Sequence, residues 1–183
     1  GLHLEGKLAE LLERIGRKRP FVAVGDAVPK TQLLPIGNDL FDPHIWFDAK
    51  LWSCCPPAVA GALSKLDAKS AEQYRQGATK YAAELLELDR TIRQKFETIP
   101  RQRRVLITAH DAFRYFGRAY GIEVVGVQGT STESEAGLAD MNQLVDTIVT
   151  RRIPAVFVET SVSDRNVTAL IEGASARGHT VRL

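Results

Sequence analysis

Two of the four histidines in the sequence are placed where an imidazole could bind a metal ion. His44 follows Asp42 and Pro43 in a stretch rich in aromatic residues. The proline fixes its own backbone and favours an extended Asp42, so the imidazole extends from a stiff loop. A metal ligand needs such a fixed direction. The alternative for His44 is a packed or hydrogen-bonded side chain, and the sequence leaves both interpretations open.

His110 and two carboxylates form the second group of candidates. His110 follows the apolar stretch 105–108, and Asp111 comes directly after it. A neutral imidazole there could point into a cleft while a nearby carboxylate fixes its tautomer, or it could cap the next helix. Glu159 follows the apolar residues 155–158. It is a candidate metal ligand, a partner for a ligand, or an acid that begins a helix.

Sequence motifs exclude several classes of enzyme. The chain has no glycine-rich phosphate loop of the GxxxxGK[ST] kind, no GxGxxG after a strand, no HExxH and no GxSxG. An enzyme would have to use His110 as a general base with Glu159 as its partner. His3 and His179 have no apparent partner residues in the sequence, and we interpret both as structural.

The segment that must position the candidate residues is Ser70–Thr98. Its apolar residues recur at spacings of three and four without a proline, which predicts one long amphipathic helix. A helix of about 29 residues would be roughly 44 Å long, longer than a small domain is wide. We therefore expect it to join two lobes, with the metal chemistry in the cleft between them. The predicted domains are 1–69, the linking helix 70–99, and an α/β lobe over 100–183.

The elements before this helix are less regular. The sequence predicts an amphipathic helix over Leu4–Ile15, a buried strand at Phe21–Val24, a loop over 26–43, and a helix over Phe47–Leu66 that Pro56 and Pro57 must break or kink. A loop with several proline and glycine residues is a common place for site residues.

The elements after Pro100 alternate between strand and helix. Strands are predicted at 105–108, 123–127, 155–158 and 180–183, and helices at 112–120, 138–151 and 167–176. Apolar strands separated by helices indicate a parallel sheet with both faces covered. Ligands of such sheets bind outside the carboxyl ends of the strands, where residues 109–111, 128–129 and 159–160 fall.

Composition gives no global case for binding nucleic acid or an anionic membrane. The net charge is +2, from 24 basic and 22 acidic residues that are interspersed. Arg101, Arg103 and Arg104 form the one dense basic cluster, which is either a solvated loop after the long helix or a phosphate site. Cys54 and Cys55 are adjacent, so no disulfide between them is expected. No run of about 20 apolar residues is present.

Four stretches of the sequence carry a family resemblance. They are Gly1–Glu5, Asn38–Trp52, Val105–Gln128 and Ala155–Ser161. Together they resemble the zinc and manganese solute-binding proteins of ABC transporters, the TroA-like metal receptors. The resemblance implies an α/β fold of two parallel-sheet lobes joined by one long helix, with both lobes incomplete at the ends of this chain.

The resemblance also implies a metal site with four ligand positions between the lobes. His44 matches the second position and His110 the third, while Asp111 and Glu159 match recurrent positions near the site. The first ligand is expected upstream of Gly1 and a late aspartate downstream of Leu183, so both ends are expected to be cut. Two imidazoles half-fill a tetrahedral Zn²⁺ site, which predicts weak binding unless water, Glu159 or a second chain supplies oxygen ligands.

The implied function is that of an extracytoplasmic receptor, periplasmic or anchored at the cell surface. It would capture Zn²⁺ or Mn²⁺ and deliver the ion to an ABC permease, with no organic cofactor and no catalysis. A histidine at position 110 is more similar to the zinc-type members, although histidine-bearing receptors also take manganese. The alternative is a truncated, transport-incompetent or adhesin-like relative with little metal affinity. Exposed sheet edges at the ends also favour self-association.

Overall fold

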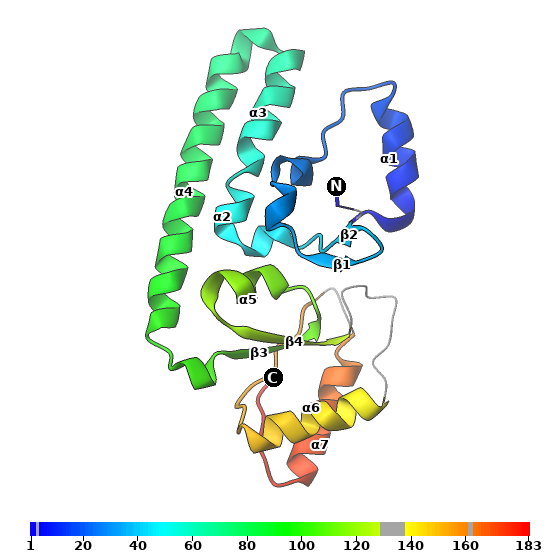
Figure 1. Ribbon diagram of the computed structural model, residues 1–183, viewed down its shortest axis with the longest axis vertical. Coiled ribbons are helices and arrows are strands. Elements are labelled where there is room, and N and C mark those ends of the chain that lie inside the picture. Colours follow the sequence, from blue (N-terminus) through cyan, green and yellow to red (C-terminus); the bar gives the residue numbers. More distant parts are fainter. Residues whose placement is uncertain (3, 129–137, 161–162) are drawn as a thin grey trace. The chain divides into compact units, whose positions relative to one another are not determined.

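The computed structural model describes residues 1–2, 4–128, 138–160 and 163–183. The chain divides into two compact units, Gly1–Lys95 and Phe96–Leu183, which Figure 1 shows in the colours of the sequence. This boundary falls in the last turn of the long helix. The three-part division into 1–69, 70–99 and 100–183 therefore stays a prediction.

The first unit is mostly helical. Its α-helices are α1 (Ala9–Gly16), α2 (Ala49–Trp52), α3 (Cys55–Leu66) and α4 (Ala71–Glu97), and the last two residues of α4 belong to the second unit. Short 3-10 helices occur at Gly6–Leu8, Val24–Ala27, Lys30–Gln32, Ile45–Phe47 and Ala68–Ser70. Strands β1 (Pro35–Gly37) and β2 (Leu40–Phe41) form an antiparallel hairpin.

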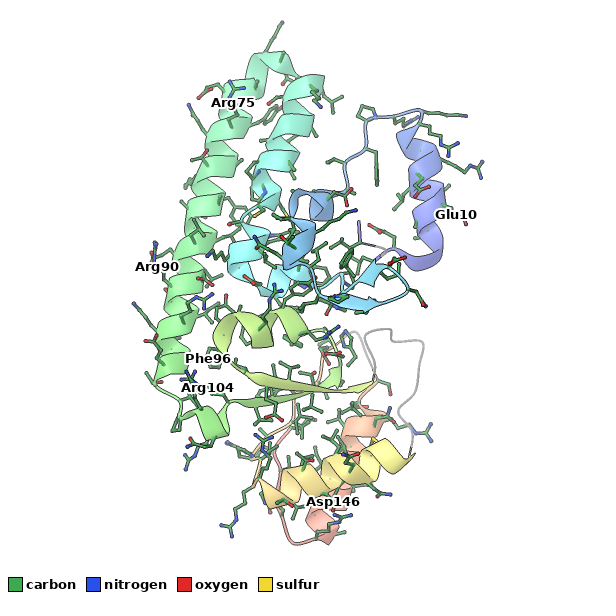
Figure 2. The ribbon with its side chains drawn as sticks, in the orientation of Figure 1. Glu10, Arg75, Arg90, Phe96, Arg104 and Asp146 are labelled. Carbon is green, nitrogen blue, oxygen red and sulfur yellow. The ribbon has the colours of Figure 1, made fainter. Side chains whose placement is uncertain are left out.

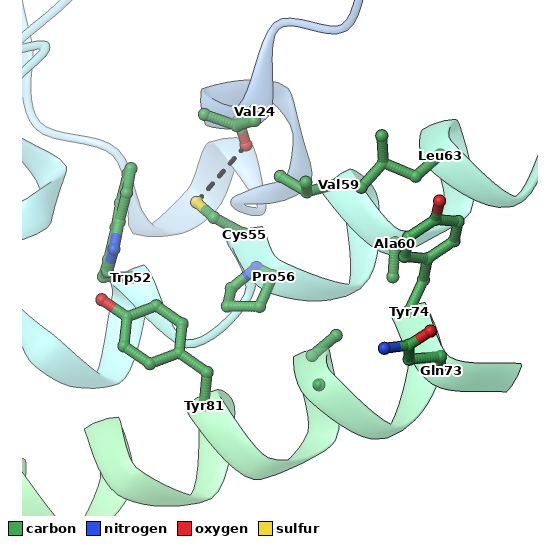
Figure 3. Close-up of a pocket in the computed structure, with 12 residues that line it drawn as sticks. Val24, Trp52, Cys55, Pro56, Val59, Ala60, Leu63, Gln73, Tyr74 and Tyr81 are labelled. Atoms are coloured by element: carbon green, nitrogen blue, oxygen red, sulfur yellow. Dashed lines mark hydrogen bonds between the residues drawn. The ribbon is translucent and has the colours of Figure 1, made fainter. Parts of the chain in front are cut away.

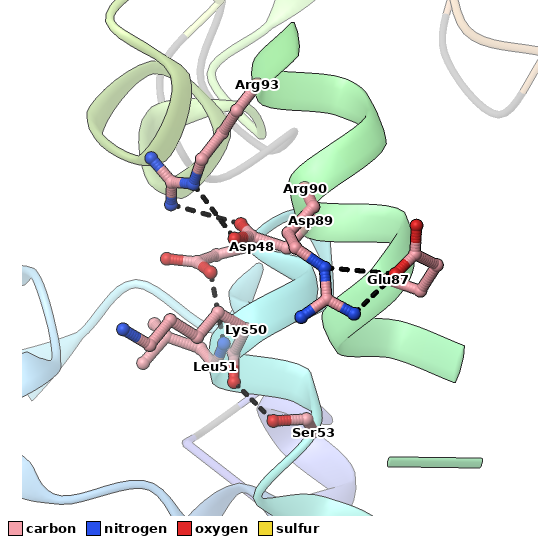
Figure 4. Close-up of polar contacts among 8 residues, drawn as sticks. All are labelled: Asp48, Lys50, Leu51, Ser53, Glu87, Asp89, Arg90 and Arg93. Carbon is pink, nitrogen blue, oxygen red and sulfur yellow. Dashed lines mark hydrogen bonds and ion pairs between the residues drawn. The ribbon is translucent and has the colours of Figure 1, made fainter. Parts of the chain in front are cut away.

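Helix α4 confirms the long helix that the sequence predicts. It has 27 residues, which corresponds to about 40 Å. Asp67 holds the N-terminal end of the helix in place, because its carboxylate accepts hydrogen bonds from the backbone N–H groups of Lys69 and Ser70 and from the hydroxyl of Tyr74. Farther along α4, the buried carboxylate of Asp89 accepts two hydrogen bonds from the guanidinium group of Arg93, one helical turn later (Figure 4).

The two prolines begin α3 and do not kink a longer helix. They occupy the first turn, where a missing N–H costs nothing, and α2 has already ended at Trp52. Asp48 caps α2 by accepting the N–H of Leu51 at 3.0 Å (Figure 4). Between α3 and α4 lies an apolar cavity of about 560 Å³, with Trp52 and Tyr81 among its lining residues (Figure 3).

The prediction of a buried strand at Phe21–Val24 is wrong. Phe21 and Val22 are 47% and 42% exposed and pair with no other strand over the residues described. An apolar run becomes a strand only if a neighbour takes its backbone hydrogen bonds. Here the N–H of Asp26 bonds back to the carbonyl of Ala23 as the 3-10 helix forms. Within its described residues, the first unit has only the β1–β2 hairpin and none of the parallel sheet expected for that lobe.

The hairpin lies inside the loop predicted over 26–43. Asn38 and Asp39 both have positive φ, 49° and 58°. Two such residues between paired strands match the tight turn that suits the natural twist of a hairpin, and Asn and Asp tolerate it. The hairpin leads directly into Asp42, so it sets the starting point of the loop that carries His44.

The second unit contains the predicted parallel sheet. Strand β3 (Val105–His110) pairs in parallel with β4 (Glu123–Gln128), with Val105 opposite Glu123. Its helices are α5 (Arg114–Tyr120), α6 (Leu138–Thr150) and α7 (Arg165–Ala176), and a 3-10 helix covers Arg101–Arg103. The strands predicted at 155–158 and 180–183 are reduced to isolated parallel bridges, Thr108 to Phe157 and Ala155 to Arg182.

Helices cover both faces of this sheet. Figure 1 shows α5 on one side of β3 and β4, with α6 and α7 on the other. The core between the sheet and α6 and α7 includes Ile107, Ile148 and Leu170, each 0% exposed. On the α5 side, Phe96, which is labelled in Figure 2, packs against Phe116 at 5.6 Å between ring centroids and stacks on Tyr120 at 6.3 Å. The last turn of α4 is therefore anchored in the second unit, and the α/β fold class with one long helix is confirmed.

Candidate metal centre

His44 is a buried imidazole fixed by a buried carboxylate. Its Nδ1 lies 2.7 Å from Oδ1 of Asp42, which is 0% exposed, and His44 itself is 7% exposed. The same oxygen accepts the backbone N–H of His44 at 2.9 Å. The ring of Trp46 meets the imidazole edge to face at 5.3 Å. Side chain and backbone are thus held by one carboxylate oxygen.

This geometry follows from the Asp-Pro-His spacing. An aspartate accepts the N–H two residues on in an Asx turn, and the proline between them supplies the fixed φ. The N–H of Asp42 is itself bound to the carbonyl of Leu34 at 2.8 Å. With Nδ1–H donating to the carboxylate, Nε2 keeps its lone pair, and this is the tautomer of a metal ligand. We assign that tautomer to His44.

His110 is the last residue of β3 and faces Glu159. Its Nδ1 lies 3.0 Å from Oε1 of Glu159, and the two side chains are 12% and 19% exposed. Sheet topology explains this pairing, because the N–H of Phe157 binds the carbonyl of Ile107 at 2.8 Å. Residues 155–157 therefore run parallel to β3, and the residues that follow each segment emerge at the same edge. The carboxylate again lies beside Nδ1, here within ion-pair distance but without the alignment of a hydrogen bond.

The backbone at His110 is also held in place. Thr108, which is 1% exposed, donates its hydroxyl to the carbonyl of His110 at 2.8 Å. A Cβ on Gly126 would lie 2.5 Å from the backbone nitrogen of Asp111, so only glycine lets β4 pass the end of β3 at this point. The carboxylate of Asp111 lies 3.9 Å from Nε of Arg114. A role for Asp111 beside the metal stays a prediction.

Each unit thus contains one imidazole that lies beside a carboxylate. Over the described ranges, no group of three or more histidine, cysteine, aspartate or glutamate side chains is gathered closely enough to hold a metal ion. Cys55 is not a thiolate ligand, because burial raises the pKa of its thiol to about 11 and its Sγ donates to the carbonyl of Val24. His179 binds the carbonyl of Ile153 through Nε2 at 2.8 Å, as a structural histidine would.

Comparison with known proteins places the chain in a family. The family profile described as "Zinc-uptake complex component A periplasmic" (ZnuA) matches residues 1–182. The chain belongs to the ZnuA family. The expected relationship to zinc and manganese receptors is thereby confirmed, and the description is that of an uptake component and not of an enzyme.

Two curated relatives are similar over the whole chain. The manganese-binding lipoprotein MntA of Bacillus subtilis is 45% identical over 184 residues, which cover 100% of this chain and 60% of MntA. The zinc-binding protein TroA of Treponema pallidum is 45% identical over 183 residues and is covered to 59%. The solved structure of periplasmic TroA matches with a TM-score of 0.94 and covers 100% of this chain and 66% of that one. The chain thus spans about 60% of the length of these relatives.

Sequence reasoning missed the carboxylate that orients His44. The proline in the sequence indicates only the backbone conformation of Asp42. The Asp-x-His spacing, which is typical of an Asx turn, could have indicated the role of the Asp42 side chain. Gly129, expected at a strand end, Ser161, the last residue of a stretch with the family resemblance, and His3 lie outside the described residues. Over the described part of the chain, no helix is both long and apolar enough to cross a bilayer.

Proposed function

We propose that this chain is the metal-capturing part of a receptor that takes up Zn²⁺ or Mn²⁺ and delivers the ion to an ABC permease. His44 and His110 are the metal ligands that the chain supplies, with Glu159 and Asp111 beside them. The ion is cargo and leaves unchanged, so no bond of a substrate is made or broken. The proposal locates the protein outside the cytoplasm, in agreement with the periplasmic family description.

The observation that carries this proposal is the repeated pairing of Nδ1 with a carboxylate. His44 has Asp42 at 2.7 Å and His110 has Glu159 at 3.0 Å. Metal-bound histidines are oriented in this way in most sites, since the carboxylate selects the tautomer and raises the basicity of Nε2. A histidine that serves packing alone, such as His179, has its Nε2 engaged with a backbone carbonyl.

The chemistry of the donors supports a borderline transition metal. Imidazole nitrogen suits Zn²⁺, whereas carboxylate oxygen suits Mn²⁺, and both donor types are present at His110 and Glu159. Both ions occur among the relatives, since MntA is named manganese-binding and TroA zinc-binding. Two imidazoles alone leave Zn²⁺ short of four ligands, so the chain by itself should bind either ion weakly.

Titration calorimetry with Zn²⁺ and with Mn²⁺ tests the proposal. His44→Ala and His110→Ala should each lower the metal affinity at least tenfold. The matched control is His179→Ala, which removes an imidazole bonded to a backbone carbonyl and should leave the affinity within twofold of the parent chain. Affinity that survives in both site variants would contradict the proposal. A parent chain that binds neither ion would favour the alternative of a transport-incompetent or adhesin-like relative.

A further prediction concerns self-association. In the described part of the second unit, β4 pairs only with β3, so its outer edge has backbone groups free for another strand. Analytical ultracentrifugation over a range of concentrations should then show a dimer. A monomer at every concentration would remove this part of the proposal and leave metal binding untouched.

A further inference from the structure

The end of the sheet opposite His110 carries a cavity lined by arginines. The cavity has a volume of about 510 Å³, and its walls come from residues 102–105 and 151–154. Arg103, Arg151 and Arg152 line it. These residues precede β3 and the parallel segment 155–157, whereas His110 and Glu159 follow them. Five residues of strand separate the two ends by roughly 16 Å, so the cavity is distinct from the candidate metal centre.

The charges around this cavity do not cancel. Arg151 forms an ion pair with Glu123 at 2.7 Å. Over the part of the chain that the structure describes, the guanidinium groups of Arg103 and Arg152 form no hydrogen bond or ion pair and are exposed to solvent. The neighbouring Arg104 is turned away to donate to the carbonyl of Ile99 at 2.8 Å. The wall of the cavity therefore has two uncompensated positive charges.

Backbone geometry at Arg152 gives an independent indication. Arg152 has φ of +51° just after the end of α6. This left-handed position at a helix end is usually taken by glycine or asparagine, because a side chain there is strained. An arginine is therefore present where backbone preference alone would select glycine. Strain of this kind is often retained where the side chain has a function.

Both segments that carry the arginines are rigidly held. Arg103 and Arg104 donate backbone N–H groups within the 3-10 turn, and the carbonyl of Arg104 accepts the N–H of Glu123 at 2.9 Å. On the other side, the carbonyl of Ile153 accepts Nε2 of His179 at 2.8 Å. A ligand would thus meet guanidinium groups whose backbones are already in place, which lowers the entropy cost of binding.

We propose that this cavity binds a phosphate group carried by a larger molecule. Guanidinium groups donate two parallel hydrogen bonds to a phosphate, and arginines from two segments can contact different oxygens of one group. A volume of about 510 Å³ exceeds what a bare phosphate ion fills and lies in the range of small-molecule sites. The phosphate can belong to a soluble organic phosphate or to an anionic lipid headgroup.

Amide-resolved NMR titration with inorganic phosphate and sedimentation with vesicles test this assignment. Phosphate should shift the amides of residues 102–105 and 151–153 in a saturable manner at constant ionic strength. Vesicles of phosphatidylcholine with about one third phosphatidylglycerol should sediment the chain, and vesicles of phosphatidylcholine alone should not, if the source is a lipid. Saturable phosphate binding without sedimentation assigns the site to a soluble phosphate compound.

Three variants separate the cavity from general electrostatics. Arg103→Gln and Arg152→Gly should each weaken phosphate binding at least fivefold, and Arg152→Gly should keep or raise the thermal midpoint because it relieves a strained φ. Arg165→Gln removes the same charge at the start of α7, outside the cavity, and should change binding less than twofold. Absence of any binding, or equal weakening in all three variants, would overturn the proposal.

Discussion

Replacing Asp42 by asparagine isolates the contribution of an orienting carboxylate to metal affinity. Asparagine has nearly the same size and can still accept a hydrogen bond, so the loop should fold. It removes the charge that faces Nδ1 of His44 across 2.7 Å in a site where Asp42 is 0% exposed. Loss of such a partner typically weakens metal binding by 10- to 100-fold, which corresponds to about 1.4–2.8 kcal/mol of binding free energy.

Titration calorimetry with Zn²⁺ at pH 7 measures this loss directly. Glu159→Gln, which changes the carboxylate beside His110, should lower the Zn²⁺ affinity less, by about 3- to 30-fold. The distance between Nδ1 and the carboxylate is longer there, 3.0 Å, and both side chains are more exposed. Asp67→Asn is the matched control, since Asp67 is also a hydrogen-bonded carboxylate but caps a helix and contacts no histidine. Asp42→Asn with Zn²⁺ affinity within twofold of the parent chain, while His44→Ala loses binding, would refute the orienting role.

Three other perturbations test the fold around the site. Gly126→Ala should lower the free energy of unfolding by about 1–3 kcal/mol, seen in urea denaturation, because its Cβ would meet backbone atoms of Asp111 at 2.5–2.6 Å; unchanged stability would contradict this packing. Hydrogen bonds from Ser70 and Tyr74 lower the pKa of Asp67 below 3.8, so its stabilisation is complete above about pH 4 and is lost as the pH falls further. The difference in free energy of unfolding between the parent chain and Asp67→Asn should therefore decrease in acid. A difference that does not depend on pH would refute the lowered pKa of Asp67. Alkylation at pH 8 should spare Cys55, whose pKa is raised to about 11 by burial and by Cys54, until the chain is denatured; labelling of the native thiol would contradict that burial.

Periodicity predicted the long helix closely, because its signal is local and repeated. The stripe of spacing three and four over 70–98 has no proline, and α4 covers Ala71–Glu97. The alternation after Pro100 likewise predicted β3, β4 and α7. Such elements can be recognised in the sequence, because a surface helix needs one apolar face and a strand of a covered parallel sheet needs two.

The strand at Phe21–Val24 failed because strands depend on partners far away in sequence. Its four apolar residues satisfy the local pattern, but over the described residues no segment pairs with them, and Phe21 is 47% exposed. The same dependence reduces the strands predicted at 155–158 and 180–183 to single bridges. Pattern reveals which segments can be strands, and only the assembled chain decides whether they pair.

The sequence indicated some of the side chains that lie together in the structure, and their role as metal ligands stays a prediction. His44 and His110 were singled out because each is placed by a stiff element, a proline-led loop and the end of a strand. Glu159 lies beside His110, as is expected of residues that follow two parallel strands at the same edge of the sheet. The pairing of Asp42 with His44 was missed: the Asp-x-His spacing allows an Asx turn, but the rotamer that brings the carboxylate to Nδ1 is seen only in the structure.

Imidazole ¹⁵N NMR during a Zn²⁺ titration tests the central claim most directly, because it reports which ring nitrogen binds the metal. Before metal is added, His44 and His110 should both carry the proton on Nδ1, facing Asp42 and Glu159. On addition of Zn²⁺, the Nε2 signals of these two residues should shift while that of His179 stays fixed. Metal-induced shifts at Nδ1, or none at either histidine while Zn²⁺ binds elsewhere, would contradict the account.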